Sequence, residues 1–166
     1  QANLKDEIIT IFNPSTFMST SDNDAQKSTR FGLELSAQAH FNQNWQLSAS
    51  YTYLRSKDGA RLTEVRRPKN TGHLSASYQF SNEATKFNVN LSFNGEQEDL
   101  EFVASTPITR VTLDSYALVN TSLNHDFNKR FKGTLRIKNL LDDQYSEVFS
   151  YRGTGRTLLA GLEYRF

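Results

Sequence analysis

Hydrophobic and polar residues alternate along most of this chain. In the segment 31–41 every odd position is apolar, whereas the even positions carry glycine, glutamate, serine, glutamine and histidine. Because successive side chains of a strand point to opposite faces, this pattern predicts a strand with one apolar and one polar face. The same alternation, with no convincing helical period, predicts eight strands in all. The other seven lie at 45–53, 73–80, 87–94, 119–127, 131–138 and 158–166, with a shorter first strand near Glu7–Asn13.

The last strand is the most informative of the eight. Leu158, Ala160, Leu162, Tyr164 and Phe166 would share one face, and the chain stops on the aromatic residue Phe166. A final strand with an apolar face and an aromatic end is typical of a bacterial outer-membrane β-barrel. The alternation therefore predicts strands whose apolar face meets lipid.

The connections between the expected strands alternate in length. Short connections lie at 42–44, 81–85 and 125–130, and long ones at 14–29, 56–70, 97–114 and 142–155. Outer-membrane barrels have short periplasmic turns and longer extracellular loops. Counting back from a last strand that runs toward the periplasm, every long connection falls outside. Aromatic residues gather at the strand ends beside the short turns, where amphipathic rings favour the membrane interface.

Composition excludes several classes of partner and site. The 166 residues suffice for one domain, and 19 Lys and Arg against 18 Asp and Glu argue against nucleic acid as a partner. The chain has no cysteine, which excludes a disulfide framework and a cysteine-based zinc site. No apolar run approaches the ~20 residues of a membrane helix. The chain begins at Gln1, so we expect a signal peptide to have been removed or to lie outside this piece.

The polar face allows two kinds of barrel. It consists mostly of serine, threonine and asparagine, which suits a wide wet lumen or a wall that lies against a plug. A small barrel filled by its own side chains stays possible, because charged residues of this face could form an internal network. These residues are Arg30, Glu34, Arg136, Glu163 and Arg165.

Several motifs resemble the end of a TonB-dependent outer-membrane receptor. They are Asn139–Asp142, Tyr145, the pair Gly155-Arg156 and the terminal Tyr164-Arg165-Phe166, with similar receptor segments at 50–53 and 66–68. Leu141 stands where the family usually has phenylalanine. Within the family, the run 145–156 is most similar to the cobalamin (vitamin B12) transporter branch, although catecholate-siderophore receptors end similarly.

The resemblance implies an all-β fold, an antiparallel transmembrane β-barrel of the 22-stranded type with a plugged lumen. Residues 1–166 would then be the C-terminal part of that barrel, its last eight strands, with the plug domain absent from this chain. An open eight-stranded sheet would expose unpaired edges to lipid. We therefore expect this chain to pair with an N-terminal barrel and plug portion of the same receptor.

The function implied by the resemblance is energy-coupled uptake of a scarce nutrient complex, cobalamin or an iron-siderophore, at the outer membrane of a Gram-negative bacterium. The implied partners are TonB, reached through the plug, the barrel-assembly machinery, and outer-membrane lipid with lipopolysaccharide. No enzyme activity and no cofactor are expected. The alternative is a self-contained eight-stranded outer-membrane barrel with a structural or adhesive role. A third possibility, an outer-membrane enzyme such as a protease or acyltransferase, would need converging histidine, aspartate or serine at the outer rim, where no histidine is expected.

Candidate site residues lie in the long connections. Arg66 and Arg110 are candidates for substrate contact, because guanidinium groups bind anions and phosphates. The resemblance to the cobalamin branch implies Tyr151 and Arg152 as further candidates. The arginines of these connections could instead meet lipopolysaccharide phosphates or simply be solvated. Gly161, Tyr164 and Phe166 are the candidate signal for the barrel-assembly machinery.

Other polar clusters are better explained without chemistry. The Asn139–Asp142 segment favours turn formation over catalysis, because Asn and Asp side chains bond their own backbone. The acidic cluster at 96–101 favours a solvated loop over a calcium site, since it lacks EF-hand spacing. The three histidines have no metal-binding spacing, and no Gly-x-Ser-x-Gly motif is present, so neither a metal nor a catalytic residue is assigned.

Overall fold

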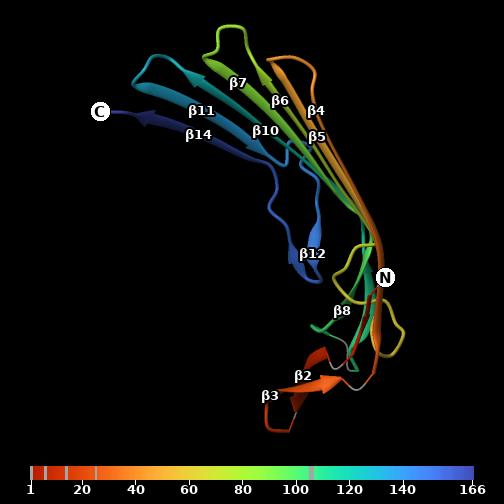
Figure 1. The fold of residues 1–166 in the computed structure, drawn as a ribbon. Helices are drawn as coiled ribbons and strands as arrows, with labels where there is room; N and C mark the ends of the chain where they lie inside the picture. Colours follow the sequence, from red (N-terminus) through yellow and green to blue (C-terminus); the bar gives the residue numbers. More distant parts are fainter. Residues whose placement is uncertain (1, 6, 14, 25, 105–106) are drawn as a thin grey trace.

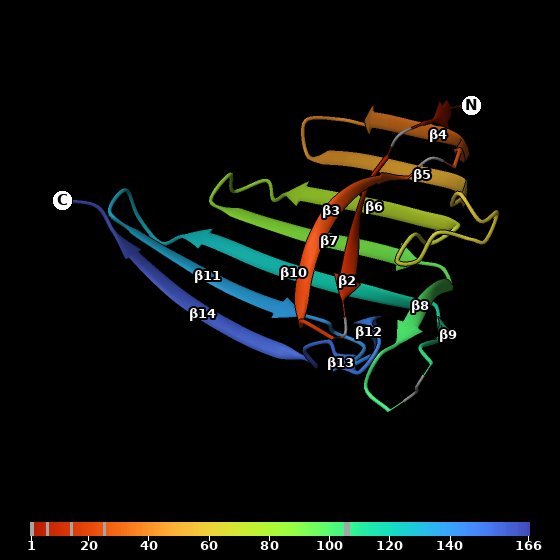
Figure 2. The same ribbon diagram turned by 90° about the horizontal axis from the view of Figure 1, so that it is seen from below.

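The computed structural model describes residues 2–5, 7–13, 15–24, 26–104 and 107–166. Eight strands form one antiparallel sheet in the order β1-β4-β5-β6-β7-β10-β11-β14 (Figures 1 and 2). Three two-stranded hairpins, β2–β3, β8–β9 and β12–β13, complete the fold. Over the described residues, no helix is long and apolar enough to cross a membrane. The strands are β1 (Ala2–Leu4), β2 (Glu7–Asn13), β3 (Met18–Asp24), β4 (Ser28–His40), β5 (Trp45–Lys57), β6 (Asn70–Gln79), β7 (Thr85–Asn94), β8 (Gln97–Glu101), β9 (Thr109–Leu113), β10 (Tyr116–Asp126), β11 (Phe131–Lys138), β12 (Ser146–Val148), β13 (Tyr151–Arg152) and β14 (Thr157–Tyr164).

The register of the sheet confirms the predicted apolar face. Leu35 pairs with Tyr51, Leu74 with Leu91 and Leu135 with Ala160, so the apolar rows of neighbouring strands lie on the same side. These side chains are exposed: Leu35 is 57% and Leu162 82% accessible. Among the described hydrophobic residues only Leu113 is buried. An exposed apolar surface of this extent must be shielded from water, and in the wall of a membrane barrel the surrounding lipid shields it.

The two ends of the sheet differ as the sequence predicts. The short turns lie at the upper end in Figure 1, and the long connections with their hairpins lie at the lower end. Each short turn contains an asparagine whose Oδ1 accepts hydrogen bonds from the backbone two and three residues on. Asn42, Asn82 and Asn128 all do this. This side-chain chemistry favours a tight turn over further strand.

Aromatic rings stack along the short-turn end, as expected for a membrane interface. Trp45 and Tyr78 lie 4.6 Å apart between ring centroids, and Tyr78 and Phe80 lie 4.9 Å apart. At the last strand, Tyr164 lies 4.8 Å from Phe131 and 5.0 Å from Phe166. The predicted clusters therefore form between neighbouring strands as well as within one strand.

The strand predicted at Glu7–Asn13 forms, but its place as the first strand of the wall was wrong. Glu7–Asn13 is β2, which pairs with β3 in a separate hairpin, whereas the sheet begins with the short β1. In the register, Leu4 pairs with Ser28, the first residue of β4, so β4 offers no partner to later residues. The chain therefore leaves the sheet after Leu4 and pairs locally. Two other expected loops, 97–114 and 142–155, likewise contain the hairpins β8–β9 and β12–β13.

Candidate functional site

The long connections form one end of the molecule, which we call the mouth. It consists of the residues that the structure describes within 5–27, 58–69, 95–115 and 139–156. Figure 1 shows the sheet bent, with the β12–β13 hairpin on its concave side, and Figure 2 shows β2–β3 crossing the mouth. The polar face of the sheet is this concave side, because Tyr116, which shares the face of Asn120 on β10, stacks on Tyr145 of the β12–β13 connection. The mouth therefore opens over the polar wall.

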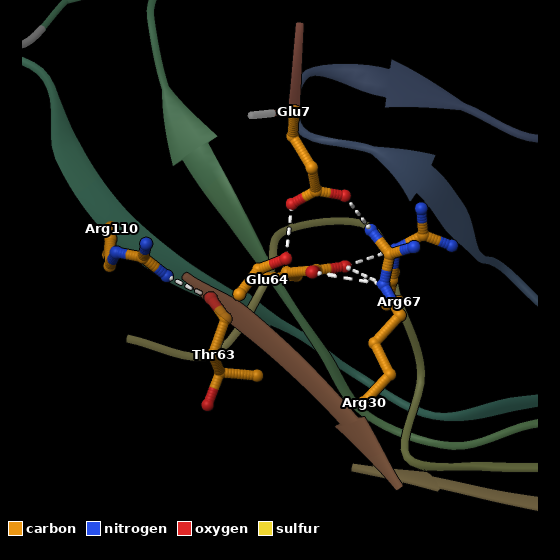
Figure 3. A network of polar contacts seen from close by, with 7 residues as sticks. Glu7, Arg30, Thr63, Glu64, Arg67 and Arg110 are labelled. Carbon is orange, nitrogen blue, oxygen red and sulfur yellow. Dashed lines mark hydrogen bonds and ion pairs between the residues drawn. The ribbon is translucent and has the colours of Figure 1, made fainter. Parts of the chain in front are cut away.

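An ion-pair network attaches the β2–β3 hairpin to the sheet (Figure 3). The guanidinium of Arg30 on β4 lies 3.0 Å from Glu7 and 3.1 Å from Glu64, measured between nitrogen and oxygen. Glu64 also pairs with Arg67, and Ser28 donates a hydrogen bond to Glu7. The network therefore joins β2, β4 and the 58–69 connection, in place of the lumen network that the sequence allowed for Arg30.

A buried carboxylate joins three connections of the mouth. Asp99 on β8 has no accessible side-chain surface. Its Oδ1 accepts hydrogen bonds from Arg66 Nε at 2.8 Å and from its neighbour Leu100 N–H, and its Oδ2 accepts one from Phe149 N–H at 2.6 Å. The expectation of a solvated acidic cluster was thus wrong for Asp99, because three donors replace its water.

These donors also set the protonation of the group. Burial acts to raise the pKa of Asp99, but the hydrogen bonds from Phe149 and Leu100 and the Arg66 guanidinium outweigh burial and hold the pKa below its ordinary value of 3.8. A carboxylate whose pKa is lowered in the folded state stabilises that state at any pH above its ordinary pKa. This stabilisation is lost as the pH falls through the pKa of the folded state.

We predict that acid loosens the mouth through Asp99. With spin labels on cysteines introduced at Ala60 and Thr154, in a chain without native cysteine, the distance distribution should be narrow at neutral pH and broaden below pH 3.8. Asp99→Asn should show the broad distribution already at neutral pH, because the amide loses the ion pair and brings its own donors to Phe149. An Asp22→Asn control, on β3, should behave as the native protein. A native distribution in Asp99→Asn contradicts the assignment.

The predicted contact residues Arg66 and Arg110 are both engaged by the protein itself. Arg66 holds Asp99, and its backbone N–H donates to the Glu98 carbonyl. Arg110 donates to the Thr63 carbonyl at 2.6 Å and pairs with Asp58 at 3.1 Å. Both therefore brace the 58–69 connection against β8–β9, and their role in substrate contact stays a prediction.

The Asn139–Asp142 motif forms a second hub, which confirms the turn interpretation. Asn139 is 3% exposed, and its amide donates to the carbonyls of Asp143 and Thr154, while its Oδ1 accepts from the Asp143 N–H. Asp142 accepts a hydrogen bond from the Arg156 N–H at 2.7 Å. The motif thereby closes the base of the whole β12–β13 connection.

This closed connection shapes a cavity of about 430 Å³ on the concave side. Tyr116 and Tyr145 stack at 4.6 Å between ring centroids, and Asp114, Gln144 and Arg152 line the cavity beside them. A side chain at Gly153 would place its Cβ 2.3 Å from the Tyr145 ring, so only glycine lets the ring occupy this position. Arg152 makes no ion pair with any residue that the structure describes.

Aromatic faces with one unpaired guanidinium suit a planar or anionic group. Of the sequence-predicted contact residues, only Arg152 lines this cavity. Tyr151 is 66% exposed and lies 6.5 Å from Phe102, between ring centroids, in a neighbouring aromatic cluster. Tyr116 and Tyr145 were missed as cavity residues, because their contact depends on how the β12–β13 connection folds back over β10. Throughout the described ranges, no cluster of histidine and acidic residues could hold a metal ion.

The proposed assembly residues lie at the other end of the last strand. Gly161 pairs with Thr134 and Tyr164 with Phe131, so both lie within the β11–β14 ladder. Phe166 follows Tyr164 on the apolar face, and its side chain is fully exposed. Recognition of these residues by an assembly machinery stays a prediction.

Comparison with known proteins found one matching family profile and several curated relatives. The profile of the family "TonB dependent receptor-like, beta-barrel" matches residues 1–140. The ferric-pyoverdine BN7/BN8 receptor of Pseudomonas putida is 23% identical over 145 residues, which cover 85% of this chain and 17% of that receptor. The vitamin B12 transporter BtuB of Vibrio cholerae is 29% identical over 84 residues, or 51% of this chain and 14% of the transporter. The chain thus spans less than a fifth of these curated relatives.

Solved structures show the same fold. The ferripyoverdine receptor of the outer membrane of Pseudomonas aeruginosa aligns with a TM-score of 0.76 at 15% identity, over 98% of this chain and 23% of the receptor. The ferric-catecholate import receptor Fiu of Escherichia coli aligns with a TM-score of 0.75 at 19% identity, over 99% of this chain and 24% of the receptor. At these identities the likeness concerns the fold. The curated relatives are a receptor and a transporter, and neither is an enzyme.

Proposed function

The chain belongs to the TonB-dependent receptor β-barrel family of the Gram-negative outer membrane, and on that premise we propose that it forms the C-terminal barrel wall and part of the ligand-binding mouth of an uptake receptor. The receptor admits a scarce nutrient complex, an iron-siderophore or cobalamin, with energy supplied through TonB. The observation that carries the proposal is the braced mouth: a cavity with an aromatic wall and an unpaired guanidinium stands over a polar sheet face.

The remaining barrel strands and a plug belong to the same proposal. Both edges of the sheet, β1 and β14, have one hydrogen-bonded neighbour among the described strands. Unpaired strand edges are too costly in lipid to persist, so further strands must close the wall. The polar face, with serine, asparagine and threonine joined across strands as in Ser77–Asn88 and Asn124–Thr134, suits contact with a hydrated plug.

The same geometry favours binding over chemistry on the ligand. The cavity is lined by tyrosine, glutamine, serine, threonine and leucine, with one carboxylate, Asp114, and one arginine, and no histidine lines it. The mouth carboxylates Asp99 and Glu64 are already engaged by arginines. The role we propose is therefore recognition and passage of the ligand without its conversion.

We predict that Arg152→Gln weakens ligand binding about tenfold, since one charge-assisted hydrogen bond to a ligand contributes about 1.5 kcal/mol. The measurement is equilibrium binding of ferric-pyoverdine, ferric-catecholate and cyanocobalamin to the complete receptor that contains this segment. Arg61→Gln is the matched control, because it removes the same charge from another connection of the mouth and lies outside the cavity. Equal binding by Arg152→Gln and the native receptor, for whichever ligand binds, would exclude this cavity as the site.

A further inference from the structure

Charge is absent from the apolar face except at one place. By the register of the eight-stranded sheet, Arg55 and Lys57 are the only lysine, arginine, aspartate or glutamate residues at paired positions of this face. They lie opposite Phe31 and Thr29, on neighbouring positions of β5. The concave face, in contrast, carries charged residues at paired positions of β4, β7, β10, β11 and β14, and both signs are present among them. Two cations that face outward together on an otherwise uncharged surface need a physical reason.

Their depth relative to the apolar band provides the first part of that reason. From Phe31 to Phe41 the chain advances ten residues, which at about 3.4 Å per residue and a tilt of about 40° spans about 26 Å of membrane. This matches the apolar band of a barrel, about 25 Å tall. Arg55 is paired with Phe31, so it lies at the outer edge of the band, and Lys57 lies one step beyond it. Both side chains are thus at the level of the lipid head groups on the mouth side.

The surroundings of the two cations form a small cavity. A cavity of about 190 Å³ is lined by Thr29, Arg30, Phe31, Arg55 and Lys57. The Phe31 ring meets Tyr53 edge-on, with 6.5 Å between centroids, and Lys69 Nζ lies 5.5 Å from the centroid of the Tyr53 ring. A third cation therefore borders the same aromatic pair. Aromatic rings at this height mark the boundary between acyl chains and head groups.

The two cations also lack acidic partners. Across the described part of the chain, no ion pair or side-chain hydrogen bond is formed by Arg55 or Lys57, although the mouth pairs five other arginines with carboxylates. Those five are Arg30, Arg66, Arg67, Arg110 and Arg156. The acidic residue next in sequence, Asp58, is paired with Arg110. The positive charge of the outward pair is therefore uncompensated by the protein.

We propose that Arg55 and Lys57, with Lys69 beside them, bind the phosphate of a phosphorylated lipid in the outer leaflet. A guanidinium fork and an ammonium group match phosphate oxygens in geometry and charge. The adjoining row of Phe31, Leu33 and Leu35 receives the acyl chains of the same molecule. A free phosphate would meet only the cations, whereas a lipid meets the cations and the apolar row together, which is why the occupant is a lipid.

The experiment measures retention of lipid by the complete receptor in detergent, using native mass spectrometry and lipid A with both phosphates. The Arg55→Ala/Lys57→Ala variant should bind lipid A about thirtyfold more weakly, because each cation near an anionic surface contributes about a fivefold gain in affinity. The matched control is Lys129→Ala/Arg130→Ala, which removes the same two charges from the β10–β11 turn at the opposite end of the sheet. This control should retain lipid A as the native receptor does.

Three further measurements test whether the site recognises the phosphate as part of a lipid. Lipid A without phosphates should bind the native receptor weakly, and inorganic phosphate should not displace bound lipid A. Arg55→Lys should retain most of the affinity, which keeps the test valid if the double variant assembles poorly. The proposal is overturned if the double variant or dephosphorylated lipid A binds as well as the native pair. Displacement of the lipid by inorganic phosphate also overturns it, because the site would then hold a free anion.

Discussion

An arginine at Leu35 is expected to keep the receptor from assembling stably in the membrane. Leu35 lies midway along the outward row of β4 and is exposed on the lipid face. Placing an arginine at the midplane of a transmembrane barrel costs about 2–4 kcal/mol, and the polar head cannot reach water from the middle of the strand. The measurement is the fraction of receptor that is folded in outer-membrane preparations, read from the mobility of unheated samples in gel electrophoresis.

The neighbouring residue provides the matched control. Ser36 lies one position along the same strand and, by the register, faces the concave side opposite Ser50. Ser36→Arg therefore adds the same side chain to the same strand on the wet face, and the folded fraction should stay close to that of the native receptor. Equal folded fractions for Leu35→Arg and Ser36→Arg would contradict the assignment of the lipid face on which the fold interpretation rests.

The strands of the wall could be predicted from the sequence because one local rule governs each of them. Every second residue meets lipid, so the period of two persists from Phe31 to Phe41 and recurs in β5, β6 and β7. The short turns were equally local, since Asn42, Asn82 and Asn128 each close a turn with their own side chains. A pattern that repeats within ten residues can be recognised in the sequence without knowing which distant residues it contacts.

The mouth could not be predicted in the same way, because its order comes from contacts between distant residues. Asp99 is buried only where Arg66 and Phe149, 33 and 50 residues away, supply donors to it. The strand β2 is rich in apolar residues, as a wall strand is, but β4 begins at Ser28, which already pairs with Leu4, so β4 has no residue left to pair with β2. The arginines of the long connections were predicted as contact residues from their residue type alone. In the structure, Arg66 and Arg110 form ion pairs with Asp99 and Asp58, whereas Arg152 lines the cavity without an ion pair to any described residue.

Loss of the Asn139 side chain is expected to release the β12–β13 connection from the sheet. Asn139→Ala removes three buried hydrogen bonds, each contributing about 1 kcal/mol, and leaves the Asp143 and Thr154 groups without partners. The backbone of Asn139 also has a φ of +48°, which alanine tolerates less well than asparagine. We expect hydrogen exchange across 142–156 to rise at least about tenfold, and the mouth cavity to lose its ligand affinity with it.

Two further variants separate the causes. Asn139→Gly relieves the backbone but restores no hydrogen bond, so it should loosen the connection nearly as much as alanine if the hydrogen bonds dominate, and much less if backbone strain does. Asn128→Ala removes a similar asparagine from an exposed short turn, and exchange across 142–156 should stay native. Because Asn139 holds the connection that places Tyr145 over Tyr116, native exchange in Asn139→Ala would mean that the aromatic stack, and not the buried amide, keeps this part of the mouth closed.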